Sequence, residues 1–264
     1  MDLQLTGKRA LVTGSTSGIG WATARELAGE GAHVILNGRD PARLASAVAR
    51  IQAEFPEAHI DGVQADLSSA AGCQHLLEAA GEVDILVNNL GIFEPKAFEQ
   101  IDDDDWQRFF EVNVLSGVRL SRHYLPRMKA RGWGRIVFIS SESGICPPAG
   151  MVHYGMTKSA QLSVSRGLAE TCAGTGVTVN AVLPGPTRTE GVDAFFATLA
   201  SDAGQTLAEA EHDFFKFDRP TSLLQRFIEP AEVAAMVTYV CSPRAAATNG
   251  AALRVEGGVV RTLI

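Results

Sequence analysis

Short apolar runs alternate along the chain with longer segments whose apolar residues recur at helical spacing. Seven runs are bounded by glycine, proline or polar residues: RALVTG, AHVILNG, IDGVQAD, VDILVNN, GRIVFIS, GVTVNAVLPG and AALRVEGG. Their length and β-branched content predict seven strands. The segments between them predict helices at about 18–30, from Asp40, from about Ser68, at about 102–130, around 153–158 and at about 229–241.

This regular alternation predicts an α/β fold, a Rossmann-like doubly wound parallel sheet with helices on both faces. Strands that are apolar throughout are typical of a sheet covered on both sides. No repeat or low-complexity linker divides residues 1–264, so we expect a single domain. The segment 189–228 is long and contains no predicted strand, and segments of this kind are often lids over an active site. We therefore call 189–228 the lid segment.

Composition and charge argue against several classes of partner. With 23 basic and 30 acidic residues, the formal net charge is −7, and no basic run provides a footprint for nucleic acid. We expect no membrane partner, because no apolar run reaches the length of a membrane span and the N-terminus does not resemble a signal peptide. Cys73, Cys146, Cys172 and Cys241 are scattered, which predicts small apolar side chains, no metal site and a cytoplasmic protein.

The acidic run Asp102–Asp105 is the one sequence feature that suggests a metal. It stands at the start of a predicted helix, where negative charge is favoured by the helix dipole. We interpret it as helix capping and solvation, and we predict no metal.

The sequence TGSTSGIG at 13–20 joins the first predicted strand to the first predicted helix. Its glycines allow the backbone to turn tightly and to approach a pyrophosphate, while the helix start offers free N–H groups and a favourable dipole. The strand–turn–helix context supports a dinucleotide site more strongly than the glycines alone.

The sequence HYGMTK at 153–158 places Tyr154 and Lys158 four residues apart, on one helix face. An ammonium beside a phenol stabilises the phenolate and lowers the pKa of the phenol, which would make a proton donor or acceptor that works near neutral pH. Taken alone, the same pair is equally a tyrosine and a lysine on a solvated surface.

Together these features resemble the short-chain dehydrogenase/reductase family. The resemblance rests on TGSTSGIG, NNLG at 88–91, Asn113, Ser141, Tyr154 with Lys158, LPGPTRT at 183–189 and VEGG at 255–258, and it covers essentially the whole chain. The usual motifs NNAG and VDGG are altered here at Leu90 and Glu256, and neither change removes a group that the mechanism needs.

The resemblance implies an oxidoreductase, more specifically a reductase, that transfers a hydride between a nicotinamide and a carbonyl or secondary alcohol. It implies that Tyr154 exchanges the proton, that Lys158 tunes the phenol and holds the nicotinamide ribose, and that Ser141 orients the substrate oxygen. Asn113 would hold a local helix distortion and a water, although it could also be a polar residue on a helix face. The alternative function is a nucleotide-binding regulator without turnover.

The resemblance also implies cofactor contacts along several loops. They are Gly14, Ser15, Thr16, Ser17, Gly18, Ile19, Gly20, Gly38, Arg39, Asp66, Leu67, Asn88, Gly91, Tyr154, Lys158, Pro184, Gly185, Thr187 and Thr189. The last two could instead cap a turn. Gly38 stands where an acid would select NAD, and Arg39 follows, so we expect NADP(H) to be favoured over NAD(H). Arg39 could alternatively stack on adenine or point to solvent.

The substrate is less constrained. Phenylalanines of the lid segment suggest an apolar small-molecule carbonyl or alcohol, or they pack the lid segment on the body; they include Phe195, Phe196, Phe214, Phe215 and Phe217. Glu142 follows Ser141 and is expected to face the pocket, while Arg219 could bind an anionic group of the substrate. By resemblance we expect a homotetramer, with the predicted 102–130 helix and the helix after Val152 at one interface.

Overall fold

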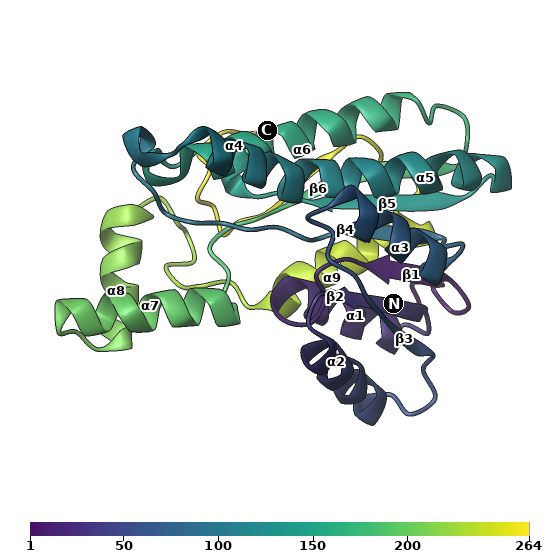
Figure 1. Cartoon of the computed structure of the whole chain (residues 1–264), viewed down its shortest axis with the longest axis horizontal. Coiled ribbons are helices and arrows are strands. Elements are labelled where there is room, and N and C mark those ends of the chain that lie inside the picture. The colour runs from purple at the N-terminus through teal and green to yellow at the C-terminus, as the bar shows by residue number, and fades with distance from the viewer. Residues whose placement is uncertain (264) are drawn as a thin grey trace.

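A computed structural model describes residues 1–263, which form one α/β domain around a parallel seven-stranded sheet in the order β3-β2-β1-β4-β5-β6-β7 (Figure 1). The strands are β1 (Arg9–Val12), β2 (His33–Gly38), β3 (Ile60–Gln64), β4 (Ile85–Asn88), β5 (Gly134–Ile139), β6 (Val177–Pro184) and β7 (Ala252–Val255). Strand order reverses between β1 and β4, and ligands bind at such switch points in doubly wound sheets. The predicted Rossmann-like sheet is confirmed.

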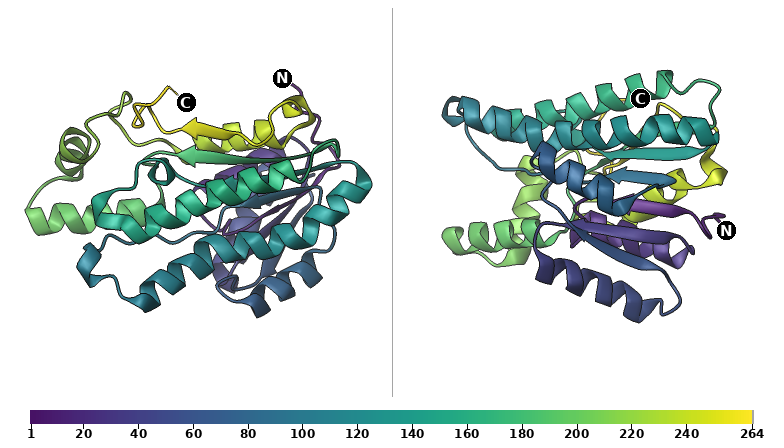
Figure 2. Two further views of the ribbon diagram at one scale, coloured as in Figure 1. Left: turned by 90° about the horizontal axis from the view of Figure 1, so that it is seen from above. Right: turned by 45° about the vertical axis from the view of Figure 1, so that its right-hand side comes forward.

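Helices cover both faces of the sheet, as the apolar strands require (Figure 2). The helices are α1 (Gly18–Gly29), α2 (Pro41–Glu54), α3 (Ala70–Ala80), α4 (Asp103–Phe110), α5 (Ser116–Arg131), α6 (Val152–Glu170), α7 (Glu190–Ala203), α8 (Leu207–Asp213) and α9 (Pro230–Cys241). One apolar core joins the sheet to α1, α2 and α9, and a second joins it to α3, α5 and α6.

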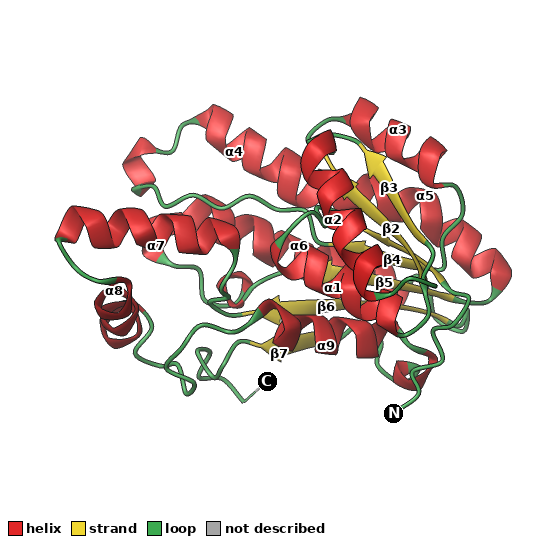
Figure 3. Cartoon of the chain, turned by 90° about the horizontal axis from the view of Figure 1, so that it is seen from below, coloured by secondary structure: helices red, strands yellow, loops and turns green. Residues whose placement is uncertain are grey.

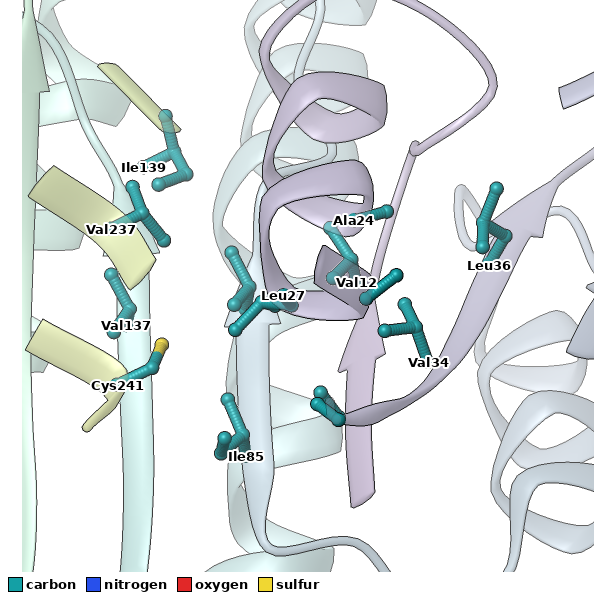
Figure 4. Close-up of a cluster of buried hydrophobic side chains, with 14 of the residues drawn as sticks. Val12, Ala24, Leu27, Val34, Leu36, Ile85, Val137, Ile139, Val237 and Cys241 are labelled. Atoms are coloured by element: carbon teal, nitrogen blue, oxygen red, sulfur yellow. The ribbon is translucent and has the colours of Figure 1, made fainter. Parts of the chain in front are cut away.

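The first of these cores packs branched side chains of the central strands against α1 and α9 (Figure 4). Leu27 on α1 is fully buried there, as are Val12 on β1 and Ile85 on β4. This packing fixes α1 against the sheet, so that the N-terminus of the helix lies at the carboxyl end of β1.

The helix predicted at 102–130 is interrupted. A π-helical turn at Glu111–Leu115 separates α4 from α5, and it contains Asn113. Such bulges are rare and are found frequently at functional sites. The start of α4 behaves as interpreted from the sequence, because Asp102 caps the helix by accepting from the backbone N–H of Asp105, while Asp105 itself pairs with Lys96 and Arg108.

The lid segment contains no named strand, as expected, but it is helical rather than a long loop. It carries α7, α8 and a π turn at Phe214–Asp218, and α7 and α8 extend away from the sheet (Figure 3). Phe196, Phe214, Phe215 and Phe227 form a small core of their own. One other expectation needs correction: Cys146 is exposed rather than packed.

We expect Leu27→Ala to lower the free energy of unfolding by about 2–5 kcal/mol, because it deletes a fully buried side chain between α1 and the sheet. Urea denaturation measures the change. The control Leu207→Ala alters an exposed position of α8 and is expected to change stability by less than about 0.5 kcal/mol. Equal losses for the two variants would contradict this account of the core.

Candidate active site

The glycine-rich loop between β1 and α1 forms an open cradle at the strand ends. Gly14 and Gly18 adopt positive φ angles of 59° and 57°, which favour glycine. A Cβ on Gly20 would lie 2.4 Å from Asn89 Nδ2, so no larger residue fits there without movement. Ser17 makes no side-chain cap on α1, which leaves the first N–H groups of the helix available. Uncapped amides beside a glycine turn fit a dinucleotide pyrophosphate.

Ser15 supports this loop from below rather than lining it. It is fully buried, its hydroxyl donates to the carbonyl of Val12 at 2.8 Å, and its N–H donates to the carbonyl of Asn37. Asn37 in turn donates from its side chain to Val63 and Ala65. Ser15 and Asn37 therefore tie the ends of β1, β2 and β3 together.

The loop after β4 brings Asn89 to the cavity in place of Asn88. The Asn88 side chain is buried and donates to Ser121 Oγ at 3.2 Å. The Asn89 amide donates to the carbonyls of Thr13 and Gly14 at 2.9 and 3.0 Å, and Asn89 lines the cavity together with Gly91. The motif NNLG contained this second asparagine, but the sequence does not indicate which of the two side chains turns outward.

At the outer edge of the cradle, Arg39 is exposed beyond β2. A Cβ on Gly38 would lie 2.4 Å from Thr16 Cγ2, so this position is closed to larger residues unless Thr16 turns. Asp66 is exposed nearby and accepts from the Ser68 N–H, which lowers the pKa of its carboxyl, whereas Leu67 is buried. Arg39 is therefore exposed close enough to Asp66 for its charge to help lower the pKa of that carboxyl.

Ser141, Tyr154 and Lys158 converge on one cavity of 270 Å³, although they come from the segment after β5 and from α6. Lys158 is buried, and its Nζ donates to the Ile139 carbonyl at 2.9 Å and to Gln161 Oε1 at 3.2 Å. The Nζ lies 5.6 Å from the centroid of the Tyr154 ring. The surface alternative for the tyrosine–lysine pair is therefore wrong.

Asn113 connects the π turn to the segment after β4 and to α6. Its Oδ1 accepts from the Ile92 N–H at 2.8 Å, and its Nδ2 donates to the Ile92 carbonyl and to Thr157 Oγ1, both at 3.0 Å. Its main-chain carbonyl accepts from Gln161 Nε2 at 2.6 Å. Asn113 is a buried hub and not a polar residue on a helix face. Gln161, which also contacts Lys158, was missed from the sequence, although it lies three residues after the lysine on the same helix face.

The protonation states differ from the expectation. Burial raises the pKa of the Tyr154 phenol, more than the adjacent Ser141 hydroxyl lowers it, and the Glu142 carboxylate raises it further. Burial also lowers the pKa of Lys158 to about 7, because the ammonium has no carboxylate partner. Lys158 is not among the groups that shift the pKa of the phenol, and the raised pKa keeps the Tyr154 phenol protonated at neutral pH.

The cavity floor is completed by the segment after β6. Pro184, Gly185, Thr187 and Thr189 all line it. The Thr187 hydroxyl donates to the Gly185 carbonyl at 2.9 Å, and Thr189 caps α7 by accepting from the Val192 N–H. Both threonines therefore make the turn and cap contacts that formed their alternative interpretation, while facing the cavity.

Among residues 1–263, no cluster of three or more histidine, cysteine, aspartate or glutamate side chains could hold a metal ion. Within the same range, no helix is long and apolar enough to cross a bilayer.

Comparison with known proteins agrees with this geometry. The family model described as short chain dehydrogenase matches residues 8–200. The oxidoreductase YvaG of Bacillus subtilis (strain 168) is 52% identical over 263 residues, covering all of both chains. The 3-oxoacyl-[acyl-carrier-protein] reductase FabG of Aquifex aeolicus is 35% identical, covering 98% of this chain and 100% of the relative.

Among solved structures, L-sorbose reductase from Gluconobacter frateurii, complexed with NADPH and L-sorbose, superposes with a TM-score of 0.94. It is 32% identical, and the match covers 100% of both chains. The regulator alternative is not favoured by these relatives. The chain therefore belongs to the short-chain dehydrogenase/reductase family, as a dinucleotide-dependent oxidoreductase that transfers a hydride between a nicotinamide and a carbonyl or alcohol carbon.

Proposed function

We propose that the protein is an NADPH-preferring reductase of small carbonyl compounds, with Tyr154, Ser141, Lys158 and Asn113 as its catalytic group. The observation that carries this proposal is the convergence of Ser141, Tyr154 and Lys158 on the cavity that also meets the glycine-rich cradle. The bound nicotinamide supplies the hydride, and the protein supplies binding, orientation and the proton.

In this proposal, Tyr154 donates the proton to the carbonyl oxygen. A phenol that retains its proton suits the reductive direction, because the resting side chain is already the acid. Ser141 holds the same oxygen. Its hydroxyl donates to Glu142 in the structure. To bind the substrate oxygen, it turns away from Glu142, which keeps the two donors of Ser143.

Lys158 holds the nicotinamide ribose and Asn113 holds Lys158 in place through Gln161. The cradle 14–20 receives the pyrophosphate, with Thr16, Ser17, Gly18, Ile19 and Gly20 at its rim. Gly91, Pro184, Gly185, Thr187 and Thr189 border the nicotinamide half, and the lid segment closes over the substrate. The cavity lining supports the positions of Ile19, Gly91, Pro184, Gly185, Thr187 and Thr189.

We expect Tyr154→Phe to lower kcat by at least about 10²–10⁴-fold, because the proposed acid is removed, while cofactor still binds. The assay follows absorbance of the reduced nicotinamide across a panel of ketones and aldehydes, and fluorescence titration measures cofactor binding. The control Tyr239→Phe changes a half-exposed residue of α9 and leaves kcat unaltered. A Tyr154→Phe enzyme within about threefold of the unaltered protein would refute the assignment.

The proposed preference for NADPH rests on Arg39, which is exposed at the end of β2 where no acid stands. A charge-assisted contact to a phosphate contributes roughly 1.5–3 kcal/mol, so Arg39→Ala should weaken NADPH binding by about 10- to 100-fold and leave NADH nearly unchanged. Titration of both cofactors tests this, with Arg244→Ala, at an exposed position after α9, as a control. If NADH binds more tightly than NADPH to the unaltered protein, or if both weaken equally, Arg39 is not a phosphate clamp.

We propose that the active protein is a homotetramer, with α4, α5 and α6 at one interface. The support is the resemblance to the family together with a face of α6 that exposes small residues, including Ser163 and Gly167. Light scattering at micromolar concentration should give four times the chain mass. Gly167→Arg places a long cation on the proposed interface and should reduce that mass, whereas a single-chain mass for the unaltered protein would contradict the assembly.

A further inference from the structure

One carboxylate of the cavity has no role in the proposed proton transfer. Glu142 follows Ser141 directly and is only 5% exposed, and together with Lys158 and Arg219 it makes up the charged side chains that line the cavity among residues 1–263. A charge buried in this way is costly unless it is paired and hydrogen-bonded. Its partners therefore indicate what it can still bind.

The two oxygens of Glu142 have different surroundings. Oε2 accepts from the Ser143 N–H at 2.7 Å, from the Ser143 hydroxyl at 3.0 Å and from the Ser141 hydroxyl. Oε1 faces only the guanidinium of Arg219, with Nε at 3.4 Å, a separation too long for a strong hydrogen bond. Oε1 thus retains acceptor capacity at the cavity wall.

Arg219 comes from the lid segment, directly after the π turn at Phe214–Asp218. Its backbone N–H donates to the Phe214 carbonyl, and its Nη1 donates to the Asp218 carbonyl at 2.9 Å. The guanidinium lies 5.6 Å from the centroid of the Phe214 ring, and the side chain is 18% exposed. Its Nε and Nη2 make no hydrogen bond within residues 1–263, so this cation retains donors beside Oε1.

The remaining wall of the substrate side is mostly apolar. Five aromatic rings line it: Phe93, Phe195, Phe196, Phe214 and Phe227. Lys158 is already bonded to Ile139 and Gln161. Glu142 and Arg219 therefore form a polar pair in a mostly apolar cavity. The pair offers one hydrogen-bond acceptor and one donor side by side.

We propose that Glu142 and Arg219 bind a hydroxyl on the carbon next to the substrate carbonyl, so that the substrates are uncharged α-hydroxy ketones with an apolar remainder. A hydroxyl both donates and accepts, which matches Oε1 and the guanidinium. Glu142 adjoins Ser141, which holds the carbonyl oxygen in the proposed function, so the second oxygen of the substrate must be close to the first. The inference rests on that proposed function.

The reaction that follows is balanced with the groups already named. The carbonyl carbon accepts the hydride and forms a C–H bond, the C=O π bond breaks, and the oxygen takes the proton of Tyr154. The ketone is reduced to a vicinal diol, and the nicotinamide is oxidised. A substrate carboxylate fits less well, because Glu142 already stands beside Arg219 and would repel it.

The test compares three phenyl ketones of similar size with NADPH. They are α-hydroxyacetophenone, propiophenone, in which a methyl replaces the hydroxyl, and benzoylformate, which carries a carboxylate. The methyl of propiophenone forms no hydrogen bond, so this ketone would leave the Arg219 donor and the Glu142 acceptor buried without partners. That cost disfavours propiophenone. We expect kcat/KM for α-hydroxyacetophenone to exceed that for each of the others by about 10- to 100-fold.

Two variants assign the preference to the pair. Glu142→Gln and Arg219→Gln should each bring the ratio of kcat/KM for α-hydroxyacetophenone over propiophenone to within about threefold of unity. The control Glu170→Gln breaks an exposed ion pair with Arg166 and should leave the ratio unchanged. Arg219 makes no contact with Ser141 in the described structure, so its variant keeps the test valid if Glu142→Gln fails to fold. Thermal melting and cofactor titration identify such a failure.

The outcomes separate this inference from the proposed function. Turnover without preference, equal losses on both ketones in both variants, or a preference for benzoylformate would overturn the inference and leave the reductase intact. Absence of turnover with every carbonyl compound, while cofactor binds, would overturn the reductase proposal and this inference with it.

Discussion

The hydrogen bonds of Asn113 hold the active site together. Its side-chain oxygen accepts from the N–H of Ile92, and its side-chain NH₂ donates to the Ile92 carbonyl and to the Thr157 hydroxyl. Its main-chain carbonyl accepts from Gln161. That carbonyl belongs to the π turn at Glu111–Leu115. A single residue therefore joins the loop after β4, the α4–α5 helix and α6, and it fixes the helix that carries the tyrosine and the lysine.

Burial then decides the electrostatics of this rigid site. Lys158 has no carboxylate partner, so desolvation brings its pKa to about 7 and leaves the Tyr154 phenol protonated. Beside them, Glu142 accepts hydrogen bonds from three donors and pairs with Arg219. Two buried ionisable groups thus have different surroundings: the lysine lies among the groups proposed to receive the cofactor, and the carboxylate lies near the aromatic rings of the proposed substrate side.

The lid segment connects these two sides. Its phenylalanines pack against one another in a small separate core, and some of the same rings line the cavity. Arg43 on α2 pairs with Glu190 at the start of α7 at 2.6 Å, so the segment also reaches the cofactor side. This exposed pair contributes little stability by itself, whereas the aromatic contacts account for the position of the helices.

The sequence by itself determined the parallel sheet and the helices on both of its faces, because these depend on local periodicity. It also determined the glycine-rich loop and the serine–tyrosine–lysine group, because these are motifs of fixed spacing. It could not determine that Asn89 rather than Asn88 faces the cavity, that Ser15 lies beneath the loop, or that Arg219 reaches Glu142 from a residue 77 positions away. Nor could it determine the raised pKa of Tyr154. Side-chain direction, desolvation and long-range pairing depend on how distant elements pack, and only the tertiary structure decides them.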